Sequence, residues 1–291
     1  MKKMSGILLV LCLWLGTATV AAAQDQSGLL HQPPKILTVN REVLKPGKGG
    51  AAHERTESAF VRAMTAAKAS DYYIALDSLT GVSRTLFLSG ASSFAEWEKT
   101  QRAEQGNATL SAALDRAVEA DGDLLQSYET ATYIYNAEQS NEPPGLAGAR
   151  YFEIEVFTIK PGHESDWDAI VKLVKPALMK ANPEDHWAMY DRIYGGANAA
   201  VVMRPLKSAA EIDHSIAADP KFFEAMGEDG MRKLGELSAI ALQSVEANLF
   251  AINPRISYVS AEMAGGDPFW KAAKTAAPAA AHKKEAEKPA Q

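Results

Sequence analysis

The stretch Ile36-Leu-Thr-Val-Asn-Arg-Glu-Val-Leu-Lys-Pro-Gly47 has a counterpart later in the chain, Tyr151-Phe-Glu-Ile-Glu-Val-Phe-Thr-Ile-Lys-Pro-Gly162. Both stretches are rich in β-branched and aromatic residues and end in Lys-Pro-Gly, a pattern typical of a strand that closes in a turn. The two Lys-Pro-Gly tripeptides lie 115 positions apart (160 − 45), and Ser-x-x-Glu recurs at the same offset, from 93–96 to 208–211. Because several features recur in the same order, we predict a duplicated unit.

Each copy predicts the same order of elements. After the first turn, apolar residues recur at helical spacing, and His53 on one helix takes the position that Trp167 holds on the other. A glycine turn then marks a hairpin, and Ser-x-x-Glu forms a capping box at the start of a second helix. The order strand, helix, strand, strand, helix, strand is the split βαβ plan. We predict an α+β fold, in which two tandem ferredoxin-like βαββαβ units pair as an intramolecular dimeric α/β barrel and cover each other's open sheet faces.

The predicted organisation has six segments. Residues 1–23 are typical of a signal peptide, because two lysines precede a short apolar core and a small-residue cleavage site. We therefore expect a periplasmic or secreted protein that has no transmembrane anchor after signal cleavage. The first unit is predicted over 35–137, a linker over 138–149, the second unit over 150–253, a C-terminal extension over 254–270 and a disordered tail over 271–291. Because the linker holds the two units at a high effective concentration, we expect a monomeric pseudo-dimer.

Charge and composition exclude several classes of function. The chain has 30 Lys and Arg against 36 Asp and Glu, a net charge of −6, which disfavours binding to nucleic acid. The single cysteine, Cys12, lies in the predicted signal peptide, which excludes thiolate chemistry from the mature protein. The sequence has no Gly-rich phosphate loop, no nucleophile elbow and no His-x-x-His or His-Glu-x-x-His spacing. We predict no cofactor and no metal site, while ligands from distant strands could still converge.

The pattern resembles the dimeric α/β-barrel superfamily of ferredoxin-like domains, including its antibiotic-biosynthesis-monooxygenase-like (ABM-like) and NIPSNAP-like members. The resemblance covers residues 35–253 and depends on the element order, on Pro161-Gly162-His163-Glu164 after a strand, and on Asp219-Pro220-Lys221-Phe222 in a helix. It implies a fold in which cofactor-free oxygenases, haem enzymes and proteins without a known reaction all occur. The sequence contains no catalytic motif of the family, so the resemblance implies no catalytic residue.

Strand alternation identifies candidate ligand-binding residues. The apolar faces of the first strands, with Leu37 and Val39 in one copy and Phe152 and Ile154 in the other, are predicted to meet the helices. The opposite faces are polar and are predicted to point into the space between the two sheets. The candidates on these faces and on neighbouring strands are Asn40, Glu42, Tyr73, Glu129, Glu153, Glu155 and Glu246. They would surround a polar cavity, or would be partly solvated and make structural hydrogen bonds. A residue repeated in both copies favours a structural role, whereas a catalytic site would more often survive in one copy only.

Three residues are candidates for acid–base chemistry. His186, Tyr190 and Arg192 follow one another at strand spacing, and imidazole titrates near neutral pH. His53 could face a pocket or could be a hydrogen-bonded histidine at the edge of the core. The sequence therefore predicts an exported protein that binds a small polar or aromatic molecule between its two sheets. The alternatives are a cofactor-independent monooxygenase-like enzyme and a structural or interaction protein of the cell envelope.

Overall fold

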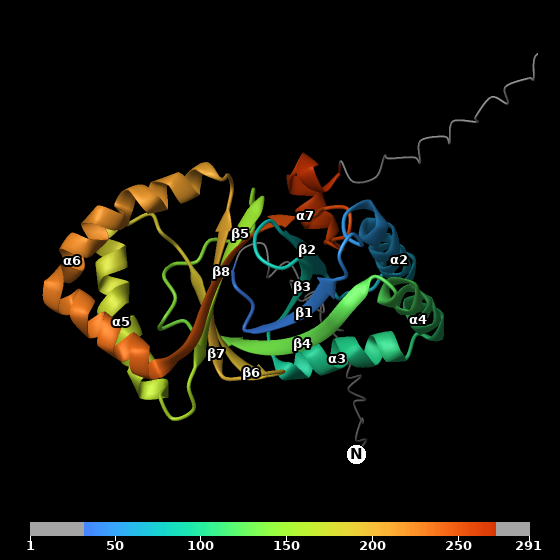
Figure 1. Cartoon of the computed structure of the whole chain (residues 1–291). Coiled ribbons are helices and arrows are strands. Elements are labelled where there is room, and N and C mark those ends of the chain that lie inside the picture. Colours follow the sequence, from blue (N-terminus) through green and yellow to red (C-terminus); the bar gives the residue numbers. More distant parts are fainter. Residues whose placement is uncertain (1–31, 272–291) are drawn as a thin grey trace, which may run out of the picture.

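The computed structural model describes residues 32–271, so the predicted signal peptide and nearly all of the predicted disordered tail lie outside the described residues. This part of the chain forms eight strands, and helices lie between some of the strands and after the last one (Figure 1). The strands are β1 (Ile36–Leu44), β2 (Tyr73–Ser78), β3 (Arg84–Ala91), β4 (Leu125–Tyr135), β5 (Tyr151–Ile159), β6 (Ala188–Tyr194), β7 (Ala199–Leu206) and β8 (Leu242–Ile252). The helices are α2 (Ala51–Ala67), α3 (Phe94–Gln105), α4 (Ala108–Gly122), α5 (Glu164–Ala181), α6 (Ala210–Ala241), α7 (Ala261–Gly266) and the 3-10 helix η1 (Pro268–Trp270). None of the described helices is both long and apolar enough to cross a membrane.

All eight strands form one closed antiparallel barrel in the order β1-β3-β2-β8-β5-β7-β6-β4. The prediction of two tandem ferredoxin-like units that cover each other's sheet faces is therefore wrong. The strands join edge to edge instead, because β2 pairs with β8 at Leu76 and Ile252, and β4 pairs with β6 at Ile134 and Asp191. Closure satisfies the backbone groups that two separate sheets would leave unpaired at their edges.

The barrel interior is mainly apolar, although Arg41, Arg84 and Glu246 line a small cavity together with residues of its core, and this reverses the predicted orientation of the first strands. Leu37, Val39, Phe152 and Ile154, which we expected to face the helices, belong to the main core cluster inside the barrel. The interior of an eight-stranded barrel is only wide enough for its own side chains to fill, so it favours the apolar face of each strand. The polar faces of β1 and β5 consequently point outward, and that of β1 lies under the helices of the first half of the barrel.

The helices pack outside the barrel in two groups (Figure 1). Helices α5 and α6 pack against each other on one side, and α2 and α4 pack against each other on the opposite side. Beneath α5 and α6 the space is filled by a second apolar cluster that includes Ile159, Trp167 and Trp187. The short elements α7 and η1 add Met263 and Trp270 to the main core, so the C-terminal extension packs against the barrel. The two helical layers therefore cover chemically different faces of one barrel.

Candidate functional site

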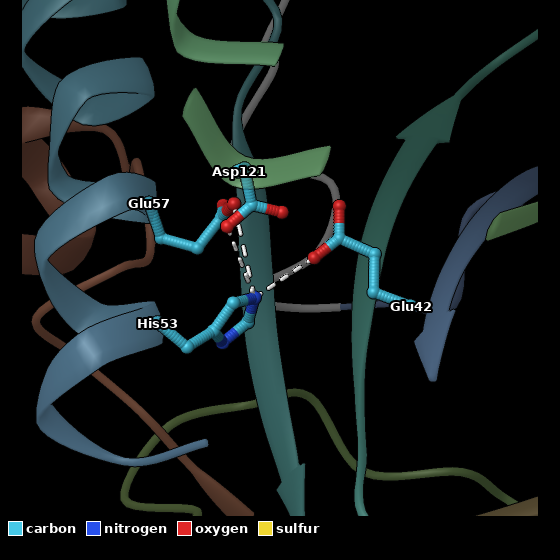
Figure 2. A group of neighbouring side chains, drawn as sticks. All are labelled: Glu42, His53, Glu57 and Asp121. Atoms are coloured by element: carbon cyan, nitrogen blue, oxygen red, sulfur yellow. Dashed lines mark hydrogen bonds and ion pairs between the residues drawn. The ribbon is translucent and has the colours of Figure 1, made fainter. Parts of the chain in front are cut away.

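Four ionisable side chains meet between the barrel and the helices of the first half, and we call them the acidic cluster: Glu42, His53, Glu57 and Asp121. Figure 2 shows Glu42 reaching from β1, His53 and Glu57 from α2, and Asp121 from the last turn of α4. His53 and Glu57 are four residues apart, so one turn of helix places them on the same face. The cluster therefore forms because one face of α2 packs over the polar side of β1.

The distances around the His53 ring are short. His53 Nε2 is hydrogen-bonded to Glu42 Oε2 at 2.9 Å, and it lies 3.8 Å from Asp121 Oδ1 and 3.9 Å from Glu57 Oε1 (Figure 2). The Thr56 hydroxyl lies 2.5 Å from Asp121 Oδ1 and fixes the orientation of that carboxyl group. One imidazole nitrogen therefore faces three carboxyl groups at once.

Burial makes this arrangement costly for a metal-free protein. The exposed fractions of the four residues are 7% for Glu42, 2% for His53, 3% for Glu57 and 2% for Asp121. Burial, followed by the charges of Glu42 and Asp121, raises the pKa of Glu57 to about 10. Burial also raises the pKa of Glu42, although its hydrogen bond with His53 opposes the change. The cluster can be neutralised by protons or by a cation, and a protonated carboxyl group can donate a hydrogen bond.

The acidic cluster borders a cavity of about 600 Å³, which lies between the outer face of the barrel and the helices. Most of the exposed lining is apolar, and it includes Phe60, Met64, Phe87 and Leu114. The ionisable carboxyl groups that line it are Glu42, Glu57, Asp71, Glu104 and Asp121, and no lysine or arginine is among the lining residues. This lining is favourable for apolar surface and for hydrogen-bond donors or cations, and unfavourable for anions.

Unpaired buried polar atoms converge on this cavity. Among the described residues, five buried side-chain polar atoms have no hydrogen-bond partner. Four of these atoms belong to residues that line the cavity: Glu57 Oε1, Tyr73 Oη, Glu104 Oε1 and Asp121 Oδ2. Most buried polar atoms in proteins have a partner, so unpaired atoms gathered in one place mark this cavity as the candidate binding site.

A second pair of carboxyl groups, Asp71 and Glu104, lines the same cavity. Burial raises the pKa of Asp71 from 3.8 to about 6, and burial followed by the charge of Asp71 raises that of Glu104 from 4.5 to about 7. Because these folded-state values exceed the unfolded ones, the associated stability is present at pH 4 and is lost as the pH rises to about 7.

We therefore expect the substitution Asp71→Asn to stabilise the protein at pH 8 by roughly 1–2 kcal/mol, after allowance for partial exposure, and to have little effect at pH 4. Melting temperatures measured at both pH values test this. Asp115→Asn, on the exposed side of α4, is the matched control and should have the same small effect at either pH. A gain from Asp71→Asn that is equal at both pH values would contradict the expectation.

The corresponding region in the second half of the barrel holds an apolar cluster. There Phe157 takes the place of Glu42 and Trp167 that of His53, and the two rings pack with their centroids 4.9 Å apart. The fold is therefore stable with an aromatic pair at this position. Since the acidic cluster occurs in one half only, packing does not require it.

The structure brings some of the predicted ligand-binding residues together and separates others. Asn40, Glu42 and Tyr73 line the cavity described above, on the outside of the barrel rather than between two sheets. Glu129 and Glu246 line a smaller cavity of about 160 Å³, where Glu129 pairs with Arg41 at 3.2 Å and Glu246 with Arg84 at 2.8 Å.

Glu153 and Glu155 lie on the other half of the barrel and belong to neither of these cavities. Both pair with Arg204, which also contacts Asp185. This closed ion-pair network favours a structural role for the two glutamates.

The three acid–base candidates do not line a common cavity among those described. The Tyr190 hydroxyl donates to the Pro34 carbonyl at 3.2 Å, and Arg192 donates to the Tyr133 hydroxyl at 3.0 Å. His186 precedes β6, and its buried Nδ1 has no partner. Their strand spacing therefore does not bring them to a shared substrate position.

Two members of the acidic cluster were not selected from the sequence, although one signal was present. The spacing His53-x-x-x-Glu57 places a histidine and a glutamate, two residue types that bind metals, on one helical face. This spacing differs from the His-x-x-His and His-Glu-x-x-His motifs. No local pattern marks Asp121, because only the packing of α4 against α2 brings it to the cluster.

No protein-family model and no curated protein sequence matches the chain. Solved structures with similar folds include a presumed monooxygenase from Fusobacterium nucleatum, with 10% identity, a TM-score of 0.46 and coverage of 75% of this chain and 91% of that one. A mutant chlorite dismutase from Candidatus Nitrospira defluvii has 10% identity and a TM-score of 0.47, over 79% of this chain and 96% of its own. A haem-binding protein from Thermus thermophilus has 11% identity and a TM-score of 0.38, over 77% and 94%. Similarity at this level assigns neither a family nor an activity to this chain, and it gives no support to a NIPSNAP-like relationship.

Proposed function

We propose that the protein binds a small, mainly apolar organic molecule in the cavity between the barrel and helices α2 and α4. The observation that carries the proposal is the convergence of four unpaired buried polar atoms on one apolar cavity of about 600 Å³. A ligand would place its apolar body against Phe60, Phe87 and Leu114 and a hydrogen-bond donor or cationic group toward Glu57 and Asp121. The predicted signal peptide supports a role outside the cytoplasm.

Charge further restricts the class of ligand. Five carboxyl groups and no lysine or arginine line the cavity, so phosphates, sulfonates and carboxylates would be repelled. A haem does not fit for the same reason, because its propionates would have no cationic partner in this cavity. In addition, His53 does not line the cavity, so its imidazole is not placed to bind the iron of a haem held there. The supported ligands are therefore neutral or cationic.

Two fluorescent probes with the same anilinonaphthalene skeleton test this proposal. N-phenylnaphthylamine is neutral and carries one N–H donor, whereas anilinonaphthalene sulfonate adds one negative charge. We expect the neutral probe to bind with a Kd on the order of 100 µM, from the usual ligand efficiency of drug-sized molecules. The sulfonate should bind at least about 10-fold more weakly, because its charge meets no cation. Fluorescence titration of chelator-treated protein measures both values.

A cavity-filling variant locates the bound probe. Leu114→Trp would fill the cavity from α4, and we expect it to weaken N-phenylnaphthylamine binding at least about 10-fold. Ala112→Trp places the same side chain on the exposed side of the same helix and should leave the Kd within about twofold. Binding that is equal in both variants, or stronger binding of the sulfonate, would contradict the proposed site.

A further inference from the structure

We propose that the acidic cluster, Glu42, His53, Glu57 and Asp121, binds one divalent first-row transition-metal ion at the wall of the cavity. This inference goes beyond the binding of an organic molecule, and its test uses the metal alone. The evidence comes from the positions of the ligand atoms, from their missing partners and from the charge of the cluster.

The ligand atoms are already close to a coordination geometry. Each of the four residues offers one nitrogen or oxygen atom, and these atoms all lie within 4.8 Å of one another. A transition metal binds imidazole and carboxylate atoms at about 2.0–2.2 Å, which separates neighbouring ligand atoms by about 3–4 Å. The separations around His53 Nε2, from 2.9 to 3.9 Å, fall in this range. Small side-chain adjustments would therefore be enough to enclose an ion.

Two of the carboxylate oxygens have no hydrogen-bond partner. Glu57 Oε1 and Asp121 Oδ2 are buried and make no hydrogen bond, and both residues are at least 97% buried. The hydrogen bond from Thr56 satisfies only Asp121 Oδ1 and leaves Oδ2 free to bind a cation. A metal ion would supply the missing partner for both carboxyl groups, as buried charges normally require.

The charge of the cluster favours a cation whenever its carboxyl groups are ionised. Three carboxyl groups surround one imidazole, and His53 is the only basic side chain that pairs with any of them in the described structure. With all carboxyl groups ionised, even a protonated His53 would leave two uncompensated negative charges in a buried site. When His53 is neutral and coordinates through Nε2, a divalent ion compensates two of the three carboxylate charges and leaves a net charge of −1 on the cluster.

The ligand types restrict the identity of the ion. Carboxylate oxygens suit Mg²⁺, Ca²⁺ and Mn²⁺, whereas imidazole suits Zn²⁺, Fe²⁺ and Cu²⁺. A site with one imidazole and three carboxylates favours ions that accept both, such as Mn²⁺, Fe²⁺ and Zn²⁺. It disfavours Ca²⁺, which prefers oxygen ligands alone.

The position of the cluster gives the ion access to the cavity. Glu42, Glu57 and Asp121 line the cavity, while His53 lies behind them and is not among the lining residues. An ion at their centre would face the cavity on one side. It would then polarise an atom with a free electron pair, such as a hydroxyl oxygen, on a neutral molecule bound there.

Metal titration of chelator-treated, full-length protein tests the site. We expect Mn²⁺ to bind with a stoichiometry of one per chain, measured by loss of the free-ion signal in electron paramagnetic resonance. At a free Mn²⁺ concentration about 100 times the Kd, the melting temperature should rise by about 5–10 °C. Ca²⁺ at the same concentration should produce a shift of less than about 2 °C, because it lacks affinity for the imidazole ligand.

Two ligand variants and one matched control assign the binding to the cluster. Glu57→Gln and His53→Gln should each weaken Mn²⁺ binding at least about 100-fold, because each removes a ligand. Glu54→Gln makes the same exchange on the same helix, but its carboxylate contacts Arg255 at 3.0 Å outside the cluster, so its Kd should match the unsubstituted protein. Circular dichroism of each metal-free variant confirms that it is folded.

Each outcome decides the proposal. Single-site binding that is lost in both ligand variants and kept in the control supports it. Absence of binding by Mn²⁺, Fe²⁺ and Zn²⁺, or binding that persists in Glu57→Gln and His53→Gln, overturns it. Neither result depends on N-phenylnaphthylamine, so a cavity that binds the probe without a metal site, or the reverse, is directly distinguishable.

Discussion

Replacement of Glu57 by glutamine should stabilise the metal-free protein, even though it removes a proposed ligand. Glu57 is 3% exposed, its Oε1 has no partner, and burial beside Glu42 and Asp121 raises its pKa to about 10. At neutral pH the Glu57 carboxyl group is therefore kept protonated in the folded protein, whereas it ionises freely in the unfolded chain. This difference lowers the free energy of unfolding. Glutamine avoids this difference, so we expect a gain on the order of 3 kcal/mol, or about 5–10 °C in melting temperature.

Differential scanning calorimetry in the presence of a chelator measures this gain. Glu54→Gln on the same helix is the control, and it should lower the melting temperature slightly because it breaks the ion pair with Arg255. With Mn²⁺ at about 100 times its Kd the difference in melting temperature should largely disappear, since the ion would stabilise the unsubstituted protein by about 2.7 kcal/mol and the variant far less. If Glu57→Gln destabilised the chelator-treated protein, Glu57 would instead be a structural group of the core.

The acidic cluster is expected to lower the stability of the metal-free protein while it binds a metal ion. A comparison of the two halves of the barrel agrees with this expectation. The second half fills the equivalent position with Phe157 and Trp167 and gains an apolar contact. The first half keeps four buried ionisable groups at the same place, which reduces its stability without a bound cation. A costly arrangement in one half, with an inexpensive alternative in the other, is evidence for a function that the cluster performs.

The sequence predicted the local elements of this fold well. The first strands of both copies were predicted from their β-branched residues and their Lys-Pro-Gly turns, and they occur as β1 and β5. Closure of the barrel could not be predicted in this way, because it depends on which strand edges meet. The pairing of β2 with β8 joins residues more than 170 positions apart, such as Leu76 and Ile252.

Without knowledge of which strand edges meet, the sequence also predicted the wrong inward face for the first strands. Alternation correctly separated the polar from the apolar side of β1, but it does not state which side is inward. Glu42 was therefore selected as a ligand-binding candidate for a space between sheets, while it lies outside the barrel beneath α2. The comparison with Trp167 marks His53 in the sequence. The position of Asp121 cannot be predicted in this way, because it depends on how α4 packs against α2.

The pairing of β4 with β6 should be highly sensitive to substitution of Gly195. Gly195, in the turn after β6, has a φ of +84°, and a Cβ atom added there would lie 2.1 Å from the Thr130 carbonyl oxygen and 2.7 Å from Ala131 Cα. Both contacts are with the backbone of β4, which cannot move aside without breaking its pairing with β1 and β6. We expect Gly195→Ala to destabilise the protein by more than about 3 kcal/mol, and to lower the melting temperature by about 10 °C.

Gly162→Ala separates this steric effect from backbone strain. Gly162 has nearly the same φ, +83°, but a Cβ atom there would have no other atom within 4 Å. Its substitution should therefore cost only the strain of a left-handed conformation, about 1–2 kcal/mol. The difference in melting temperature between the two variants measures the contact between the Gly195 turn and β4, because the backbone strain is common to both. Equal losses would mean that the turn does not press against β4, and that the barrel is not closed at this position.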